Sequence, residues 1–173
     1  IKIIYIYLKI KRFLLLFFNN YDSNLKYNNM EQPMKIKLIY LDIPFWRAEV
    51  SRIALYLGNI DFEDVRVSRN DFLSIKDSGL MKDGTEIPFN QLPCINIDGE
   101  SYGQTAGIAR LCGKLSGLYP KNDLIKSIKV DQIIDLITDI TVIISPTLRE
   151  KDESKKKIMR EELFNGILTK KFS

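Results

Sequence analysis

The sequence predicts an α/β domain in the order βαβ and then ββα, followed by a segment made only of helices. Three observations predict this fold. Apolar residues alternate in short stretches, as they do in half-buried strands. Between these stretches apolar residues recur at helical spacing, and Asp98-Gly99 is a typical two-residue hairpin turn. Because a helical crossover joins the first two strands, we expect them to be parallel.

The first three elements follow from Lys35 onward. KIKLIYL alternates as a strand, AEVSRIALYLG predicts a helix that stops at Gly58, and FEDVRV predicts the second strand. A polar stretch rich in Asp, Ser and Gly then predicts a loop. The inward face of the helix is expected to carry Val50, Ile53, Ala54 and Leu57.

The second half of this domain begins with a strand expected from Leu92 to Ile97. The hairpin turn leads into a strand from Glu100 to Tyr102, and a helix from Thr105 to Leu115 completes the domain. This order is the topology of a thioredoxin-like domain without its redox cysteines. The inward side chains of the helix are expected to be Ile108, Leu111, Cys112 and Leu115.

Helices alone follow the linker GLYPKND. The run from Leu124 to Ser145 is apolar at helical spacing, and Pro146 is expected to end it. Residues 150–171 predict a second, highly charged amphipathic helix. We therefore expect an α/β domain over residues 34–116 and a partial, incomplete all-helical domain over residues 124–173.

Residues 1–33 are built almost entirely from Ile, Lys, Asn, Tyr and Phe. We interpret them as a low-complexity extension without native structure, with Met30 or Met34 as the true start. As a signal peptide the segment has too short an apolar core and no small-residue cleavage site. Its lysines and Arg12 interrupt it as a membrane span, so no membrane association is expected.

Charge and composition exclude several classes of function. The formal net charge of +4 comes from the two ends of the chain, because residues 34–148 carry thirteen basic and fifteen acidic groups. No basic stripe with interleaved aromatics is present, so nucleic-acid binding is not expected. Histidine is absent, which excludes Ser-His-Asp and Cys-His catalysis. Cys94 and Cys112 are too few for a zinc site, and no metal is expected.

NQLPCINIDGESYGQTAGIAR, from Asn90, holds two features that point to a ligand. A cis Leu92-Pro93 bond would turn the N–H and C=O of Leu92 outward, toward an extended peptide; a trans proline at an ordinary strand start is the alternative. Gln104-Thr105 opens a helix, whose free N–H groups offer an anion site; simple N-capping by Thr105 is the alternative. Together the two features favour a short acidic peptide.

From about Lys35 to Arg149 the chain resembles the cytosolic glutathione S-transferases of the tyrosine type, nearest the sigma class. The resemblance rests on Tyr40 at the end of the first strand, RAEVSR opening the first helix, PFNQLP before the third strand, the Gln104-Thr105 pair, and IAR after it. It implies that Pro93 is cis, that the backbone of Leu92 pairs with glutathione, and that Gln104 and Thr105 hold the γ-glutamyl carboxylate.

Further roles come from the same resemblance. It implies that Tyr40 donates a hydrogen bond to the glutathione sulfur and favours the thiolate. It places Arg47 and Asp139 at the glutathione site, Asp139 by reaching across a dimer, and Thr141 and Ile144 at the electrophile pocket. Lys82 is a candidate for the glycine carboxylate, because the family's usual tryptophan is absent. The chain also departs from the family by one extra residue between Tyr40 and Arg47.

The expected function is conjugation of glutathione, as co-substrate, to small apolar electrophiles in the cytoplasm, with no other cofactor. The resemblance implies a homodimer for a chain of full family length. Two alternatives stay open, namely a binding protein for glutathione or apolar ligands without useful catalysis, and a truncated product without function. The electrophile is not predicted, nor are isomerase or peroxidase activities.

Overall fold

The computed structural model describes residues 34–172. The low-complexity interpretation of residues 1–33 lies outside the described residues and stays a prediction. The division of the chain into two domains also stays a prediction.

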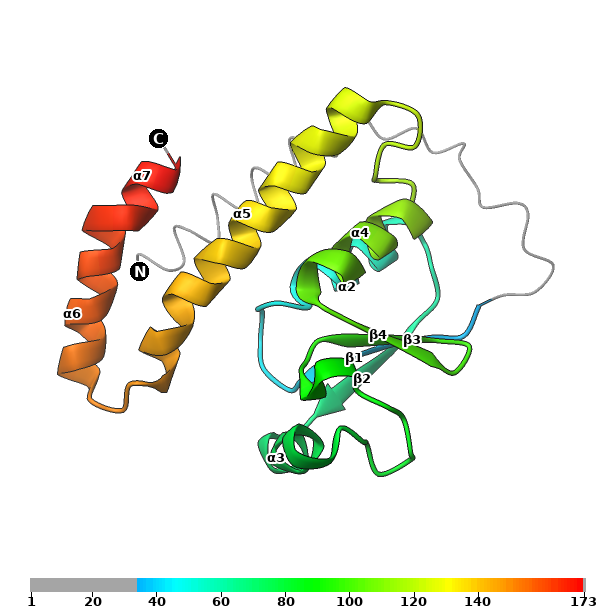
Figure 1. Cartoon of the computed structure of the whole chain (residues 1–173), viewed down its shortest axis with the longest axis horizontal. Helices are drawn as coiled ribbons and strands as arrows, with labels where there is room; N and C mark the ends of the chain where they lie inside the picture. The colour runs from blue at the N-terminus through cyan, green and yellow to red at the C-terminus, as the bar shows by residue number, and fades with distance from the viewer. Residues whose placement is uncertain (1–33, 173) are drawn as a thin grey trace.

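Four strands form one mixed sheet in the order β2-β1-β3-β4 (Figure 1). β1 (Ile36–Leu41) runs parallel to β2 (Glu63–Val67) and antiparallel to β3 (Cys94–Ile97), which pairs antiparallel with β4 (Glu100–Gly103). The predicted βαβ and ββα order and the thioredoxin-like topology are therefore confirmed.

Helices cover both faces of the sheet. α2 (Glu49–Leu57) and α4 (Thr105–Leu115) lie on one face, and α3 (Arg69–Ser78) lies on the other (Figure 1). Strand β1 is buried on both sides, since its alternate side chains enter two different clusters. The α2 and α4 side holds Ile36, Leu38, Tyr40, Leu55, Ile95, Ile108, Cys112 and Leu115, and the α3 side holds Ile39, Val67, Ile75, Ile87 and Cys94.

The buried face of α2 differs from the predicted one. Leu57 is 42% exposed, whereas Leu55 is fully buried beside Ala54. Of the four predicted residues, Ala54 is buried and Val50 and Ile53 are half-buried, and the buried face also includes Ser51, Arg52 and Leu55. Gly58 ends the helix as predicted, with a φ of −78° and its N–H donating to the Ala54 carbonyl. A Cβ there would lie 2.3 Å from the Ser116 Cβ, so glycine allows α2 and α4 to touch at their C-terminal ends.

Helix α3 was missed, because its sequence is polar and buries only Ile75. Its end signals are nevertheless clear. Ser68 caps the N-terminus by accepting a hydrogen bond from the Asp71 N–H, and Gly79 ends the helix at a φ of 73°. A short 3-10 turn, η1 (Pro88–Asn90), then leads toward β3.

Helix α5 (Leu124–Arg149) continues through Pro146, so the prediction that Pro146 ends it is wrong. A proline inside a helix removes one backbone hydrogen bond and crowds the carbonyl four residues earlier. Hydroxyls near the proline donate to backbone carbonyls, from Thr141 to Ile137 O and from Ser145 to Thr141 O. Thr147, fully buried just beyond the proline, donates to the Ile144 carbonyl at 2.9 Å and accepts from Arg160 at 3.4 Å.

The single helix expected over residues 150–171 is divided. α6 (Glu153–Leu163) is capped by Asp152, a π-helical turn η2 (Phe164–Leu168) follows, and α7 (Thr169–Phe172) ends the described chain. Gly166 causes the break with φ −103° and ψ −107°. Figure 1 shows α6 and α7 lying along α5. In the part of the chain that the structure describes, no helix is long and apolar enough to cross a bilayer.

Candidate functional site

The candidate residues of the α/β part meet at one end of the sheet. The registered pairs of β1 and β3 end at Ile39 opposite Cys94, and those of β3 and β4 end at Cys94 opposite Gly103. One residue beyond these pairs come Tyr40, Pro93 and Gln104. The N-termini of α2 and α4 follow from the same ends of β1 and β4. Three strand ends and two helix N-termini therefore surround one place.

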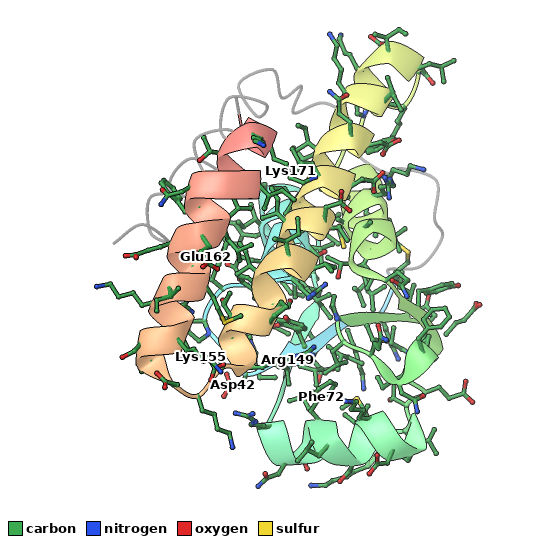
Figure 2. All side chains as sticks on the ribbon, turned by 60° about the vertical axis from the view of Figure 1, so that its left-hand side comes forward. Asp42, Phe72, Arg149, Lys155, Glu162 and Lys171 are labelled. Atoms are coloured by element: carbon green, nitrogen blue, oxygen red, sulfur yellow. The ribbon has the colours of Figure 1, made fainter. Side chains whose placement is uncertain are left out.

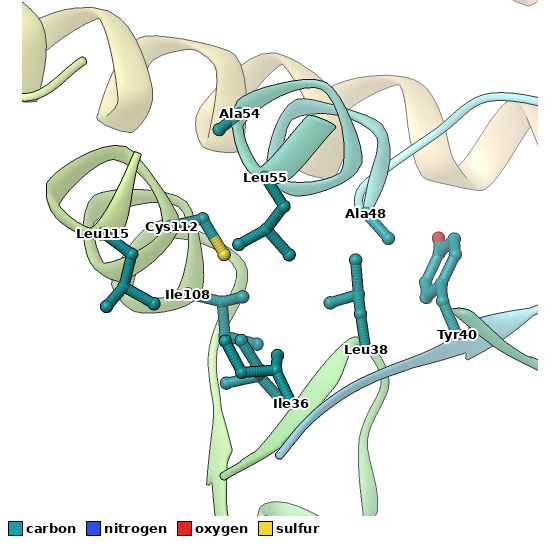
Figure 3. Packing of buried hydrophobic residues seen from close by; sticks show 10 residues of the cluster. Ile36, Leu38, Tyr40, Ala48, Ala54, Leu55, Ile108, Cys112 and Leu115 are labelled. Atoms are coloured by element: carbon teal, nitrogen blue, oxygen red, sulfur yellow. The ribbon is translucent and has the colours of Figure 1, made fainter. Parts of the chain in front are cut away.

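Tyr40 extends from β1 into the core on the side of α2, and it is 2% exposed. Its hydroxyl points toward Ala48 at the entrance of α2 (Figure 3). Burial raises the pKa of Tyr40, against the opposing effects of a hydrogen bond from the Arg47 backbone N–H and the charges of Arg47 and Arg52. The phenol is therefore protonated at neutral pH, and because its oxygen accepts from Arg47, its own proton is left to donate.

The extra residue before Arg47 is accommodated in the turn between β1 and α2. Phe45 adopts a φ of 55°, a left-handed conformation that is uncommon for a bulky residue, and its side chain is 37% exposed. Trp46 packs against the core cluster next to it. The turn keeps the Arg47 N–H beside Tyr40 despite the insertion.

Two arginines of α2 and its entrance surround Tyr40. The Arg52 guanidinium carbon lies 5.9 Å from the centroid of the Tyr40 ring, and Arg52 donates to Asp64 at 2.9 Å and Glu49 at 3.3 Å. Its Nη2 is buried without a hydrogen-bond partner. Arg47 instead reaches α5, where its Nη2 donates to the Ser145 hydroxyl at 3.1 Å.

The Leu92-Pro93 peptide bond is cis, as the resemblance implies, and the alternative of a trans proline is wrong. Pro93 is buried, while Leu92 is half-buried and lies outside the registered pairs of the sheet. β3 begins at Cys94, so the strand predicted from Leu92 is shorter than expected. Proline has no N–H to pair with β1, and the sheet consequently leaves a backbone edge at Leu92.

The mouth of α4 is not capped by a side chain. Gln104 is the N-cap residue with a φ of 74°, and Thr105 is already the first helical residue. The first helical hydrogen bond runs from the Ile108 N–H to the Gln104 carbonyl, so the N–H groups of residues 105–107 precede the helical pattern. The alternative of N-capping by Thr105 is therefore wrong. A left-handed glutamine is uncommon, and such residues concentrate at functional sites.

Some of the candidate residues of α5 lie near this site, and one forms a contact elsewhere. The Ser145 contact brings the segment with Thr141 and Ile144 to the entrance of α2, since both lie within one turn of Ser145. Asp139 is 67% exposed at its side chain and forms an ion pair with Lys171 of α7 at 3.5 Å. Lys171 is labelled in Figure 2, on the turn of α7 that lies beside α5.

Lys82 is not brought together with the other candidates by any contact. It lies in the loop after α3, its side chain is 88% exposed, and it forms an ion pair of 2.6 Å with Asp71. This ion pair is the largest cause of the lowered pKa of Asp71. The contact is internal to α3 and its following loop.

The acidic face of α5 has a role that the sequence did not reveal. Arg110 of α4 donates to Asp131 at 2.7 Å and to Asp135 at 2.8 Å, and the Tyr119 hydroxyl donates to Asp131 at 2.9 Å. We call these four residues the α4–α5 clasp. The motif IAR contains Arg110, and the i, i+4 spacing of Asp131 and Asp135 is the signal from which a cationic partner could have been inferred.

The geometry fits the binding of an acidic peptide that carries a thiol. An extended backbone can pair at Leu92, and a carboxylate can accept from the N–H groups at the mouth of α4. A protonated, donating Tyr40 beside Arg47 favours a thiolate over a thiol. Both cysteines of the described residues are buried, and burial raises the pKa of Cys112 to about 11, so they are poor nucleophiles.

Known proteins resemble this chain in sequence, although no protein-family model matches it. Glutathione S-transferase 2 of Manduca sexta is 30% identical over 128 residues, which cover 74% of this chain and 58% of that protein. Glutathione S-transferase 2 of Caenorhabditis elegans is 40% identical over 91 residues, which cover 53% of this chain and 44% of that protein.

Solved structures resemble it as well. The prostaglandin synthase D of Nilaparvata lugens matches with a TM-score of 0.63 and 30% identity, over 76% of this chain and 61% of that one. The glutathione S-transferase of Ascaris lumbricoides matches with a TM-score of 0.59 and 28% identity, over 79% and 62%. The chain spans less than two thirds of the length of these relatives. In sequence, sheet and helices the chain is therefore similar to glutathione S-transferases over the part that the two share.

Proposed function

We propose that this chain binds glutathione and joins its thiolate to small apolar electrophiles. One observation carries the proposal, which is the convergence of Tyr40, the cis Leu92-Pro93 bond and the uncapped mouth of α4 at one end of the sheet. Each of these features alone has an ordinary structural explanation. Together they match the thiol, the peptide backbone and the carboxylate of a single ligand.

Glutathione is expected to bind in extended form along the Leu92 edge. The backbone groups of Leu92 pair with its cysteinyl part, and the γ-glutamyl carboxylate accepts from Thr105 and from the first N–H groups of α4. Gln104, exposed at that mouth, supplies a further polar group. Electrostatic attraction at a helix N-terminus favours the anionic form of the ligand.

The chemical step is formation of the thiolate. A free thiol with a pKa near 8.5 is only about 3% ionised at pH 7, and lowering that pKa by about two units raises the ionised fraction roughly twenty-fold. The Tyr40 hydroxyl donates to the sulfur, and the positive charge of Arg47 acts in the same direction.

The electrophile is expected beside α5. Thr141 and Ile144 lie on the segment that Ser145 joins to Arg47, so an apolar substrate there would face the sulfur. We assign the protein to the cytoplasm. As a homodimer, it would use Asp139 for the γ-glutamyl amine of the partner, after release of Lys171. Lys82 would bind the glycine carboxylate after release of Asp71.

Calorimetric titration with glutathione and turnover of an aromatic halide test the proposal. The folded chain should bind glutathione with micromolar to millimolar affinity, and Thr105→Ala should weaken binding by roughly ten-fold through loss of one hydrogen bond to a charged group. Thr85→Ala, in the loop before β3, is the matched control and should bind normally. A folded chain without affinity for glutathione would refute the proposal, and binding without turnover would establish a binding protein instead.

A further inference from the structure

Arg47 connects the α/β part of the molecule to α5 through a neutral partner. Its Nη2 donates to the Ser145 hydroxyl oxygen at 3.1 Å, across 98 positions of the chain. Ser145 is half-buried, so the contact is partly shielded from water. Among the described residues, no carboxylate forms an ion pair with Arg47. Its guanidinium is held in place by a group without charge.

The direction of this hydrogen bond is fixed by the helix. Ser145 donates its only hydroxyl proton to the Thr141 carbonyl at 2.6 Å, within α5. The oxygen is then free only to accept, and it accepts from Arg47. The Ser145 hydroxyl is therefore held in one orientation on α5, in which its oxygen accepts from Arg47.

The other positive charges near Tyr40 are compensated. Arg52 lies against the ring, but it contacts Glu49 at 3.3 Å and Asp64 at 2.9 Å. Arg66 lies opposite Tyr40 in the register of β1 and β2, and it contacts Asp64 at 2.7 Å.

Among the described residues, the other groups at this end of the sheet form no ion pair with Arg47. Asp42, two residues after Tyr40, is exposed to solvent. Cys94 of β3 lies on the other face of the sheet, and burial raises the pKa of its thiol, so it is neutral at neutral pH. α5 contributes the uncharged Ser145 hydroxyl that contacts Arg47. Arg47 thus supplies the uncompensated positive charge at this end of the sheet.

We infer that Ser145 is a positioning residue that holds Arg47 beside Tyr40 while leaving the positive charge of Arg47 available to a thiolate. The inference rests on the proposed function. When the thiol ionises, its S–H bond breaks, the proton passes to water, and the sulfur keeps the electron pair. A carboxylate at position 145 would cancel much of the attraction between Arg47 and that sulfur, whereas a hydroxyl anchors Arg47 without cancelling it.

Three variants of the full chain test this inference by the pH profile of conjugation and by thiolate absorbance of bound glutathione. Ser145→Asp should raise the pKa of the bound thiol by about one unit, because it neutralises Arg47, and so lower turnover about ten-fold below that pKa. Ser145→Ala should lower kcat several-fold and leave the pKa within a few tenths of a unit, because Arg47 keeps its charge but loses its anchor. KM for glutathione should stay within about two-fold in both variants.

Thr138→Ala is the matched control, since the Thr138 hydroxyl donates to the Ile134 carbonyl in the same helix at 2.9 Å and has no contact with Arg47. It should leave the pKa of the thiol and kcat unchanged. A Ser145→Asp protein with the wild-type pKa would overturn the inference while leaving the proposed function intact. Absence of glutathione binding in the folded wild-type chain would overturn both. Equal losses in Ser145→Ala and Thr138→Ala would show that the hydroxyl serves only the helix.

Discussion

Two arginines join the α/β part of the molecule to α5, and they are bound in opposite ways. Arg110 in the α4–α5 clasp meets two carboxylates, at 2.7 Å and 2.8 Å, and the burial of its charge is compensated. Arg47 at the entrance of α2 meets only a hydroxyl of α5. The ion pairs of Arg110 hold α4 and α5 together. The hydrogen bond of Arg47 to Ser145 stabilises the fold less, but it leaves the positive charge of Arg47 available to the thiolate that we propose beside Tyr40.

The burial of the Arg110 contact agrees with a role in stability. The side chains of Arg110 and Asp131 are both 26% exposed, so solvent screens their attraction only in part. Tyr119 extends the clasp by donating to the second oxygen of Asp131. Asp131 and Asp135 therefore face α4 in the N-terminal half of α5, while Ser145 near the other end of α5 faces Arg47.

The largest expected effect is on kcat and comes from removing the Tyr40 hydroxyl. Tyr40→Phe should lower kcat for conjugation by roughly 10²-fold, because one preorganised donor to the sulfur is lost. KM for glutathione should change by less than about two-fold, since the peptide contacts lie at Leu92 and α4. Steady-state kinetics with an aromatic halide measure both quantities. A loss of affinity without a loss of kcat would mean that Tyr40 serves the fold and that the donor to the sulfur lies elsewhere.

A smaller effect distinguishes the two arginines directly. Arg110→Ala should lower the free energy of unfolding by about 1–2 kcal/mol, because it leaves Asp131 partly buried without its cation, at a contact that solvent still screens in part. Arg47→Ala should cost less, about 0.5–1 kcal/mol of stability, because it removes one hydrogen bond to a half-buried neutral hydroxyl, yet reduce turnover several-fold. Urea unfolding and kinetics on both variants make the comparison. Equal stability losses would show that the Arg47 contact is structural as well.

Much of the fold could be predicted from the sequence because local signals agreed with the final packing. Strand β1 lies within its predicted apolar stretch, α4 begins and ends where its apolar spacing does, and Asp98-Gly99 forms the hairpin turn. Helix α3 could not be predicted in this way, because its packing depends on one buried residue, Ile75. Its capping signals at Ser68 and Gly79 were present but were outweighed by the weak periodicity.

The candidate site could be predicted where its residues lie at the ends of paired strands. Tyr40, Pro93 and Gln104 lie at strand ends, and pairing of the strands brings those ends to one place. Ser145 lay inside the predicted helix, but nothing in the sequence indicated that its hydroxyl contacts Arg47, 98 positions away. Contacts between distant elements, such as the one between Arg47 and Ser145, depend on how α5 packs, and no local pattern encodes that.

The smallest expected effect concerns the pH dependence of the α4–α5 clasp. Partial burial acts to raise the pKa of Asp131, but the hydrogen bonds from Arg110 and Tyr119 outweigh it and hold the pKa below its usual range. The unfolded chain therefore binds more protons than the folded chain in acid. The stability that Asp131 contributes is complete above its ordinary pKa of about 4 and is lost as the pH falls through the lowered value.

Asp131→Asn should consequently flatten the dependence of stability on pH in acid. One proton contributes at most about 1.4 kcal/mol per pH unit to the slope, so the change should be visible but small. Urea midpoints for wild type and Asp131→Asn, measured between about pH 2 and pH 7, give both slopes. Tyr119→Phe is the graded control, because it removes one of the two hydrogen bonds and should flatten the slope only in part. Identical slopes in all three proteins would mean that the clasp does not hold the charge of Asp131 in solution, and Arg110 would then differ less from Arg47 than their contacts indicate.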